Sequence, residues 1–329
     1  MWYLVCVSGC GTQKRGNSLE KIITVTLNPA FDIHFKMKEF EAERENYVAN
    51  ESVDVGGKGI NISRALTENG YKNTAYVVLG RENSVGFENE LKRLGIDYVP
   101  LYTDGKIREN ITLHPENKKE TRISLDTFKM DGGLLSRVFD MIGDAVLTGD
   151  TVAFSGRLPK GVSEEMAAEQ LIRLKNKGAR LAVDCNSLSL DTLKRIKPWF
   201  IKPNEQEIAA FLGKTVEDAD KGALAAKALV LDGVAEQVMI SLGAGGCAFA
   251  CESGTYTVSV PKIEVRSTIG AGDGTIAGYI AAKTGGLDTK DALAMACAYG
   301  SAACLTDGTA PPKREDIEKI AKKITVSAF

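Results

Sequence analysis

A run of small residues that ends in an acid, Gly270-Ala271-Gly272-Asp273, stands immediately before an apolar stretch with helical periodicity. Small residues let the backbone approach a ligand closely, and the amides at a helix start, with the positive dipole end, favour an anion. A phosphoryl group that gains charge during transfer is such an anion. The Asp273 carboxylate could then accept a proton from a hydroxyl that attacks the phosphorus. The alternative is a glycine turn whose aspartate caps a buried helix.

Two further clusters lie near the start of the chain. Asp32 comes shortly after the first predicted strand, where its carboxylate could bind sugar hydroxyls or simply face water in a turn. The run 56–61, Gly-Gly-Lys-Gly-Ile-Asn, lets the backbone pack on a ligand while Lys58 supplies charge and Asn61 an amide. Its spacing is not that of a Walker A loop. A plain glycine turn before a helix is the alternative for this run.

Two clusters in the second half also end predicted strands. Asn204 and Glu207 are three residues apart, so they share one face of a first helical turn and could hold a hydrated Mg²⁺ beside phosphates. The same spacing fits an asparagine cap with a glutamate capping box equally well. The run 241–246 is a glycine-rich turn suited to a nucleotide phosphate or ribose, or else a hairpin turn into residues 247–251.

Composition restricts the class of protein. With 329 residues, 44% of them apolar, the chain can bury the core of one large α/β domain, with or without a small appendage. Its 41 basic and 43 acidic residues nearly balance and form no basic block, so no nucleic-acid partner is expected. The seven cysteines lack Cys-x-x-Cys spacing, which predicts thiols in a reducing compartment. With only His34 and His114 present, we expect neither a histidine-rich metal site nor a Ser-His-Asp triad.

The first eighteen residues differ from the rest. Residues 1–7 are apolar but too short, and lack the basic start, for a secretory signal. Residues 7–10, Val-Ser-Gly-Cys, resemble a bacterial lipoprotein cleavage box, yet no linker follows, and we expect residues 1–18 to be a nonfunctional or disordered extension. The longest apolar stretch, 292–304, is too short to span a bilayer. A cytoplasmic protein without a membrane partner is therefore predicted.

Strand and helix patterns alternate along the chain, which predicts a doubly wound, mainly parallel sheet flanked by helices. Strands are predicted at 22–27, 74–79, 98–102, 151–154, 180–184, 199–201 and 237–241, and helices at 60–69, 86–94 and 164–177, with three more at the C-terminal end. Two regions, about 32–55 and 108–125, show β-type alternation without helices. They predict a small β-sheet lid over the ligand crevice, or a dimer contact, rather than an ordinary hairpin edge.

In this order the motifs resemble the ribokinase-like phosphofructokinase B family of sugar kinases, over about residues 20–323. The resemblance rests on the runs 26–32, 56–61, 108–111, 155–159, 202–207, 241–243 and 270–273. It implies one kinase domain over residues 19–329. A dehydrogenase, by contrast, would need Gly-x-Gly-x-x-Gly after the first strand, and residues 28–33 lack it.

The resemblance implies a role for each matching residue, with ATP as co-substrate and Mg²⁺ as cofactor. Asp273 would be the catalytic base, and the run 270–272 the anion hole. The other implied assignments are Asp32, Gly57 and Asn61 for the sugar; Lys58, Arg108 and Arg157 for its phosphate; Lys202, Ser241, Gly243, Gly246 and Thr268 for the nucleotide; and Asn204 and Glu207 for Mg²⁺, partly through water. A lid sheet of this kind implies a possible homodimer.

The run 26–32, with Lys58 and Arg108, resembles the branch of 1-phosphofructokinases and tagatose-6-phosphate kinases. This favours fructose 1-phosphate, phosphorylated to fructose 1,6-bisphosphate, with tagatose 6-phosphate or fructose 6-phosphate as the alternative acceptor. Gly274 and Arg157 stand where the branch commonly has serine, and residues 120–125 also depart from it. Arg157 would add a second phosphate contact or only a surface charge. A sugar-phosphate sensor without transfer activity is the non-enzymatic alternative.

Overall fold

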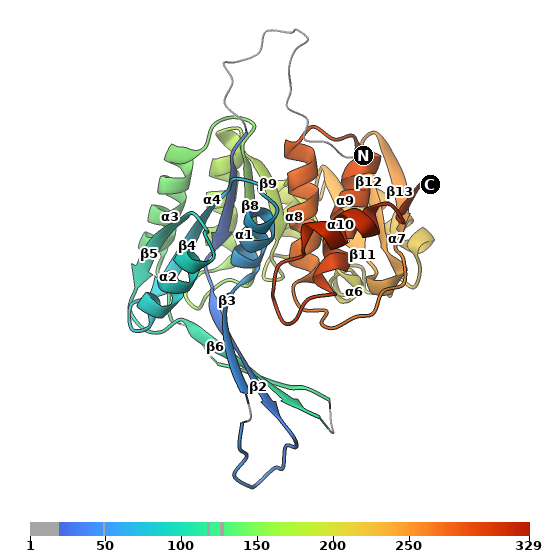
Figure 1. The fold of residues 1–329 in the computed structure, drawn as a ribbon. Coiled ribbons are helices and arrows are strands. Elements are labelled where there is room, and N and C mark those ends of the chain that lie inside the picture. Colours follow the sequence, from blue (N-terminus) through green and yellow to red (C-terminus); the bar gives the residue numbers. More distant parts are fainter. Residues whose placement is uncertain (1–19, 49, 117–118, 126–127) are drawn as a thin grey trace.

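The computed structural model describes residues 20–329 except 49, 117–118 and 126–127, so the predicted extension 1–18 lies outside the described residues (Figure 1). Its main feature is a ten-stranded sheet in the order β14-β13-β12-β11-β10-β9-β8-β1-β4-β5. Neighbours from β11 to β5 are parallel, whereas β12, β13 and β14 form an antiparallel edge. The strands are β1 Ile22–Thr26, β4 Thr74–Gly80, β5 Tyr98–Thr103, β8 Thr151–Ser155, β9 Arg180–Asp184, β10 Phe200–Ile201, β11 Gln237–Ser241, β12 Cys247–Cys251, β13 Gly254–Ser259 and β14 Thr325–Ala328.

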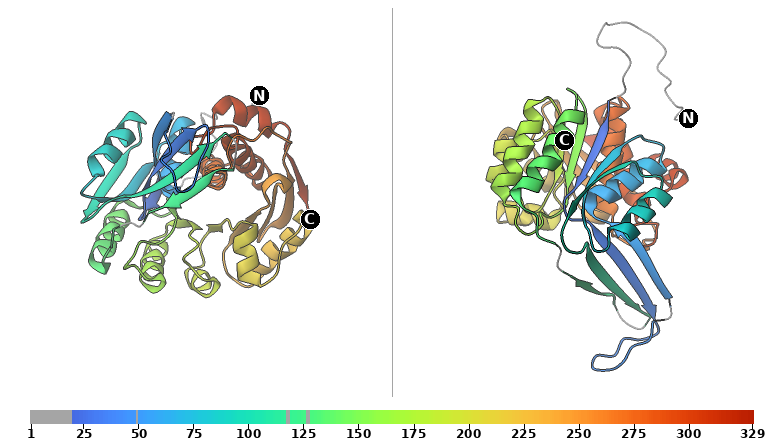
Figure 2. Two further views of the ribbon diagram at one scale, coloured as in Figure 1. Left: turned by 90° about the horizontal axis from the view of Figure 1, so that it is seen from below. Right: turned by 90° about the vertical axis from the view of Figure 1, so that its left-hand side faces the viewer.

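Helices cover both faces of this sheet, which confirms the predicted doubly wound α/β class (Figure 2). One apolar core joins the sheet to α1, α8, α9 and α10, and another joins its opposite face to α3, α4, α5 and α7. The helices are α1 Lys58–Glu68, α2 Ser84–Arg93, α3 Gly132–Ala145, α4 Glu164–Asn176, α5 Leu190–Ile196, α6 Glu205–Leu212, α7 Ala219–Leu231, α8 Ala271–Thr284, α9 Thr289–Ala303 and α10 Arg314–Ala321. No helix within these described ranges has both the length and the apolar character that a bilayer crossing requires.

Strand β1 shows why the centre of the sheet forms where the sequence predicts it. All five of its residues are buried, as expected for a central parallel strand covered on both faces. The Thr24 hydroxyl is paired locally, because it lies 2.7 Å from the Ser63 hydroxyl of α1, whereas Thr26 Oγ1 has no hydrogen-bond partner among the described residues. A Cβ on Gly59 would lie 2.7 Å from the Val25 carbonyl, so only glycine allows α1 to begin so close to β1. This contact places the start of α1 at the carboxyl end of the strand.

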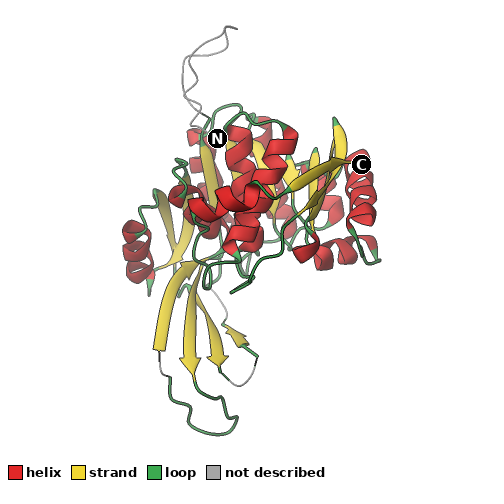
Figure 3. Cartoon of the chain, turned by 45° about the vertical axis from the view of Figure 1, so that its right-hand side comes forward, coloured by secondary structure: helices red, strands yellow, loops and turns green. Residues whose placement is uncertain are grey.

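A separate four-stranded sheet projects from the body (Figure 3). This small sheet has the order β3-β2-β6-β7, formed by β2 Ala30–Met37, β3 Asn50–Gly56, β6 Arg108–Pro115 and β7 Thr121–Ser124. It confirms the prediction of a smaller sheet drawn from these two regions, and the hairpin-edge alternative is wrong. The pairing sets Asp54, Asp32, Asn110 and Ser124 in one row and Val53, Ile33, Ile111 and Ile123 in the next. Because side chains alternate along strands, the two rows lie on opposite faces of the small sheet.

Candidate active site

A cavity of about 1090 Å³ lies beside the carboxyl ends of the central strands, with the small sheet contributing to its wall. Ligands of open α/β sheets bind at this edge. The cavity is lined by every predicted site residue except Arg157: Asp32, Gly57, Lys58, Asn61, Arg108, Lys202, Asn204, Glu207, Ser241, Gly243, Gly246, Thr268 and the run 270–273. The structure therefore brings together residues that are far apart in the sequence.

Residues 270–272, the predicted anion hole and called here the anion-binding turn, form the start of α8, which begins at Ala271. Gly270 has φ of 80°, a left-handed conformation that favours glycine. No side chain caps the start of α8, and the Ala271 amide donates only a long hydrogen bond of 3.4 Å to the Thr268 carbonyl oxygen. The amides of this first turn line the cavity together with the positive end of the helix dipole. The turn thus has the features of an anion site.

Asp273 lies in the first turn of α8 and is only 7% exposed. The Asn61 side-chain amide donates a hydrogen bond of 2.8 Å to its Oδ2. Burial, together with repulsion from Asp184, raises the pKa of Asp273 to about 6, against the opposing effects of Lys58, Asn61 and Lys202. A carboxylate with a raised pKa is a better proton acceptor than an ordinary aspartate and is still mostly ionised near neutral pH.

Gly274 replaces the serine expected from the resemblance, and helix packing gives the reason. A Cβ at this position would lie 3.2 Å from the Tyr299 carbonyl oxygen and 3.3 Å from the Ala303 Cβ, both on α9. At Gly278, one turn further along α8, a Cβ would come within 2.8 Å of the Tyr299 side chain. Helices α8 and α9 therefore pack too closely for a larger residue without adjustment. The glycine fixes the start of α8 against its neighbour.

Lys58 forms a salt bridge of 2.9 Å with Asp184, at the carboxyl end of β9. Burial opposes the charge of Lys58, but the carboxylates of Asp184 and Asp273 outweigh it and raise its pKa above the ordinary lysine value. Lys58 is therefore a fixed cation between two acids. Sequence reasoning missed Asp184; the available signal was an acid at the carboxyl end of a buried parallel strand.

The polar face of the small sheet supplies a cluster of charged groups. Asn110 donates a hydrogen bond of 2.8 Å to Asp32 Oδ1 and accepts one of 3.1 Å from Arg108. Burial lowers the pKa of Arg108, Asp32 raises it, and the nearby charges of Arg157 and Arg122 lower it further. Arg157 does not line the cavity but lies close enough to act on Arg108. Asn110 and Arg122, which line it, were missed, because their place depends on the pairing of β6 with its neighbours.

Asn204 and Glu207 form a complete capping box at the start of α6. Asn204 Oδ1 accepts hydrogen bonds of 2.9 Å from the amides of Gln206 and Glu207, and Glu207 Oε2 accepts one of 3.0 Å from the Asn204 amide. The capping-box alternative is thus confirmed. Both side chains also line the cavity. No cluster of three or more His, Cys, Asp or Glu suited to a metal occurs among the described residues. One free glutamate oxygen fits only an ion held largely by water and phosphates, as Mg²⁺ often is.

The turn after β11 forms the far end of the cavity. Residues Gly243–Gly245 make one 3-10 turn, and Gly246, with φ of 87°, leads into the antiparallel strand β12. A Cβ on Gly246 would lie 1.9 Å from the Val258 carbonyl oxygen, so a larger residue does not fit. The hairpin alternative is confirmed for the backbone, although the turn also lines the cavity. Lys202, 4% exposed, points its ammonium group toward Gly272, whose Cβ position is 3.2 Å away.

Among the residues that line the cavity, two have a buried polar atom with no hydrogen-bond partner within the described part of the chain: Asn61 Oδ1 and Arg108 Nε. Buried polar groups are normally paired, because leaving one unpaired costs about 1–3 kcal/mol. Both residues line the cavity. Their free atoms are therefore suited to bind a polar ligand there.

A sheet of this order, a smaller sheet beside its carboxyl edge and a glycine-rich helix start next to a buried acid define a class, the ribokinase-like kinases. The family model of pfkB family carbohydrate kinases matches residues 25–316, and the chain belongs to this family. It is therefore a phosphotransferase enzyme of carbohydrate metabolism.

Individual relatives agree with the family. The chain is 30% identical over 311 residues to the 1-phosphofructokinase of Rhodobacter capsulatus, covering 94% of this chain and 98% of that protein. It is 28% identical over 310 residues to the 1-phosphofructokinase of Haemophilus influenzae, covering 94% and 99%. Among solved structures, phosphofructokinase-2 from Escherichia coli in complex with potassium matches with a TM-score of 0.85 at 24% identity, covering 92% of this chain and 99% of that one. This last likeness concerns the fold.

Proposed function

We propose that this protein transfers the terminal phosphoryl group of ATP to a ketose phosphate, with fructose 1-phosphate as acceptor and fructose 1,6-bisphosphate as product. The observation that carries the proposal is the buried carboxylate of Asp273 in the first turn of α8, beside uncapped helix amides. The names of the relatives described above support the acceptor. Tagatose 6-phosphate and fructose 6-phosphate are the alternative acceptors.

Each step of the proposed reaction uses a group that lines the cavity. The acceptor hydroxyl oxygen attacks the terminal phosphorus while Asp273 accepts its proton, and the bond to the bridging oxygen of ADP breaks, so ADP leaves with the electron pair. Amides of the anion-binding turn and the ammonium group of Lys202 stabilise charge on the transferring oxygens, while Lys58 binds the phosphate that the acceptor already carries. Mg²⁺, held beside the phosphates by Asn204 and Glu207 partly through water, would neutralise phosphate charge.

The arginine cluster supports an acceptor that already carries a phosphate. Arg108 is close enough to Arg122 and Arg157 for their charges to lower its pKa, and the Asp32 carboxylate opposes them. An excess of guanidinium groups around one carboxylate favours an anionic ligand, and arginine binds phosphate through paired hydrogen bonds. A free sugar would leave this charge uncompensated.

Coupled measurement of ADP release with fructose 1-phosphate, tagatose 6-phosphate, fructose 6-phosphate and fructose tests the function directly. We expect the highest kcat/KM with fructose 1-phosphate and the lowest with fructose, which lacks the phosphate. A higher kcat/KM with tagatose 6-phosphate or fructose 6-phosphate would show that this sugar phosphate, and not fructose 1-phosphate, is the acceptor. Tight binding of a sugar phosphate without ADP release from any acceptor would favour the sensor.

Activity should fall at low pH because Asp273 loses its ability to accept a proton. With a pKa of about 6, its carboxylate is protonated as the pH drops below that value, so kcat/KM should decrease tenfold per pH unit there. The second ionisation of a sugar phosphate lies in the same range, at about 6. Asp184→Asn separates the two, because Asp184 raises the pKa of Asp273 and the variant should shift the acid limb to lower pH. If the acid limb does not move in Asp184→Asn, the loss of activity at low pH is due to protonation of the substrate phosphate.

Arg157 is expected to strengthen binding of the acceptor phosphate from a second position. In Arg157→Ser, which restores the residue common in the branch, we expect the KM for fructose 1-phosphate to rise about tenfold, because a charge-assisted hydrogen bond is lost. The KM for ATP should not change. Arg137→Ser on the exposed side of α3 is the matched control. An unchanged KM for fructose 1-phosphate would show that Arg157 is only a surface charge and does not contact the acceptor phosphate.

We also propose that residues 19–329 act as one kinase unit whose small sheet serves as lid and as dimer contact. The polar face carries Asp32 and Arg108, which line the cavity. The opposite face carries the apolar row described above, in which Val53 is 48% and Ile123 46% exposed. A half-exposed apolar row across four strands favours a second copy of the same sheet as its cover.

A further inference from the structure

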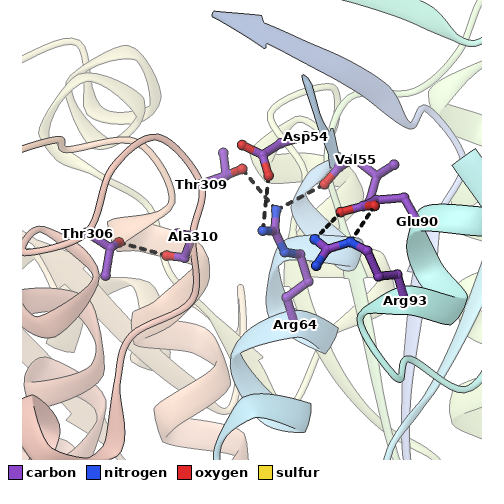
Figure 4. A network of polar contacts seen from close by, with 8 residues as sticks. All are labelled: Asp54, Val55, Arg64, Glu90, Arg93, Thr306, Thr309 and Ala310. Atoms are coloured by element: carbon purple, nitrogen blue, oxygen red, sulfur yellow. Dashed lines mark hydrogen bonds and ion pairs between the residues drawn. The ribbon is translucent and has the colours of Figure 1, made fainter. Parts of the chain in front are cut away.

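Arg64 is a buried cation that joins three separate parts of the fold. It lies on α1, one turn beyond Asn61, and is 5% exposed. Its guanidinium donates hydrogen bonds of 3.1 Å to the Val55 carbonyl oxygen and 3.1 Å to Thr309 Oγ1, and lies 3.4 Å from Asp54 Oδ1 (Figure 4). Asp54 and Val55 belong to β3 of the small sheet, whereas Thr309 belongs to the α9–α10 loop, residues 304–313.

On the β3 side, the contacts lead directly to the proposed acceptor site. Asp54 pairs in register with Asp32 on β2. A Cβ on Gly56 would lie 2.2 Å from Asp32 Oδ2, so the backbone at the end of β3 packs against this carboxylate. A movement of Asp32 upon acceptor binding would therefore displace the end of β3, where Asp54 and Val55 contact Arg64.

On the other side, the contacts lead to the anion-binding turn. Thr309 lines the cavity, and a Cβ on Gly270 would lie 3.9 Å from the Thr309 Cα, so loop and turn are in contact. The loop is braced internally, because the Thr306 hydroxyl donates a hydrogen bond of 2.7 Å to the Ala310 carbonyl oxygen (Figure 4). The Arg266 amide, just before the turn, donates one of 2.9 Å to the Cys304 carbonyl oxygen.

We propose that Arg64 is a positioning residue that couples the acceptor site on the small sheet to the anion-binding turn. It does not line the cavity itself, so it acts through Asp54 and Val55 on one side and Thr309 on the other. Binding of the acceptor orders β3, and Arg64 transmits this order to the loop that packs on Gly270. The inference rests on the proposed function, because it assumes that acceptor and nucleotide occupy the two sides of this cavity.

The chemistry of Arg64 is unusual for a residue that serves stability alone. Its single acidic partner is 3.4 Å away, and its Nε has no hydrogen-bond partner among the described residues. A buried ion pair is often no more stabilising than well-packed apolar residues of similar volume. A guanidinium can, however, hold several acceptors in fixed directions at once, which no apolar side chain can do. This capacity suits a junction between the small sheet and the loop.

The test is the effect of fructose 1-phosphate on the affinity for a non-hydrolysable ATP analogue, measured by calorimetric titration. In the wild type we expect saturating fructose 1-phosphate to tighten binding of the analogue by at least about fivefold. In Arg64→Gln this factor should fall to about one, the value for uncoupled sites. Arg137→Gln, on the exposed side of α3, is the matched control.

Two milder variants keep the test decisive if Arg64→Gln fails to fold. Arg64→Lys retains the charge but cannot bind Asp54 and Thr309 together, so thermal stability should recover while coupling stays low. Asp54→Asn should weaken coupling from the β3 side. Full coupling in these variants, or none in the wild type, would overturn the proposal. Turnover of fructose 1-phosphate is scored separately: turnover without coupling rejects the role of Arg64 alone, and coupling without turnover rejects the proposed function alone.

Discussion

Replacement of Asp273 by Asn should lower kcat with fructose 1-phosphate by about a thousandfold, because the loss of a general base typically costs 10²–10⁴ in rate. Binding should survive. The asparagine side chain has the same shape, and its carbonyl oxygen can still accept the hydrogen bond that Asn61 donates to Asp273 Oδ2. The dissociation constants for the ATP analogue and fructose 1-phosphate should therefore change by less than about threefold, a range too small for the loss of a charged hydrogen bond. ADP release and calorimetric titration measure the two effects.

The same variant should be more stable than the wild type above pH 6. Burial raises the pKa of Asp273 to about 6 from the ordinary value of 3.8, so the folded state disfavours its ionised form. Stability therefore falls as the pH rises between these two values, and the cost persists above them. At 1.36 kcal/mol per pKa unit, Asp273→Asn should raise the free energy of unfolding by about 3 kcal/mol at pH 8, and the gain should vanish near pH 3.

Two results would contradict this account of Asp273. Retention of more than a tenth of the wild-type kcat in Asp273→Asn would show that another group accepts the proton. Loss of both turnover and nucleotide binding would point to a structural role instead. Glu315→Gln, an exposed acid on α10, is the control for a non-specific effect of removing one carboxylate.

Replacement of Arg108 by Gln should raise the KM for fructose 1-phosphate by about a hundredfold, because charged hydrogen bonds to a phosphate are worth about 1.5–3 kcal/mol each. The KM for ATP should remain unchanged, since Arg108 lies on β6 of the small sheet. With fructose, which offers no phosphate, kcat/KM should be nearly the same in both enzymes. Steady-state ADP release with the two acceptors measures this selectivity.

The comparison of acceptors also provides the control for Arg108. An equal loss of kcat/KM with fructose and with fructose 1-phosphate would show that the variant disturbs Asp32 and Asn110 rather than a phosphate contact. Arg137→Gln, on the exposed side of α3, should have no effect on either acceptor.

The central fold could be predicted from the sequence because its signals are local. β1 and β9 are short apolar runs, and β9 has the same bounds in the structure as in the prediction. The glycine-rich turns before α1 and α8 were recognisable because close approach and positive φ require glycine at Gly57 and Gly270. The position of the cavity at these turns could therefore be predicted without knowledge of the tertiary structure.

The remaining features depend on contacts between distant segments. Helix α3 begins with two glycines, which have low helix propensity, and α5 has only seven residues, so neither was assigned. Asp184 gains its importance from two distant groups, its salt-bridge partner Lys58, 126 residues away, and Asp273, whose pKa it raises. Asn110 and Arg122 enter the cavity through strand register, which no local pattern specifies. The spacing of Asn204 and Glu207 fits both a metal site and a capping box, and only the structure shows that the capping box forms.

The groups proposed for chemistry and those proposed for acceptor choice come from different scaffolds. Asp273 lies in the first turn of α8, which packs closely against α9 at Gly274 and Gly278, whereas Arg108 and Arg122 belong to strands of the projecting small sheet (Figure 3). Substitutions on β6 and β7 can therefore alter which sugar is accepted without altering the apparatus that moves the phosphoryl group. Laboratory evolution toward a new acceptor should accordingly accumulate its changes on these two strands and leave α8 untouched.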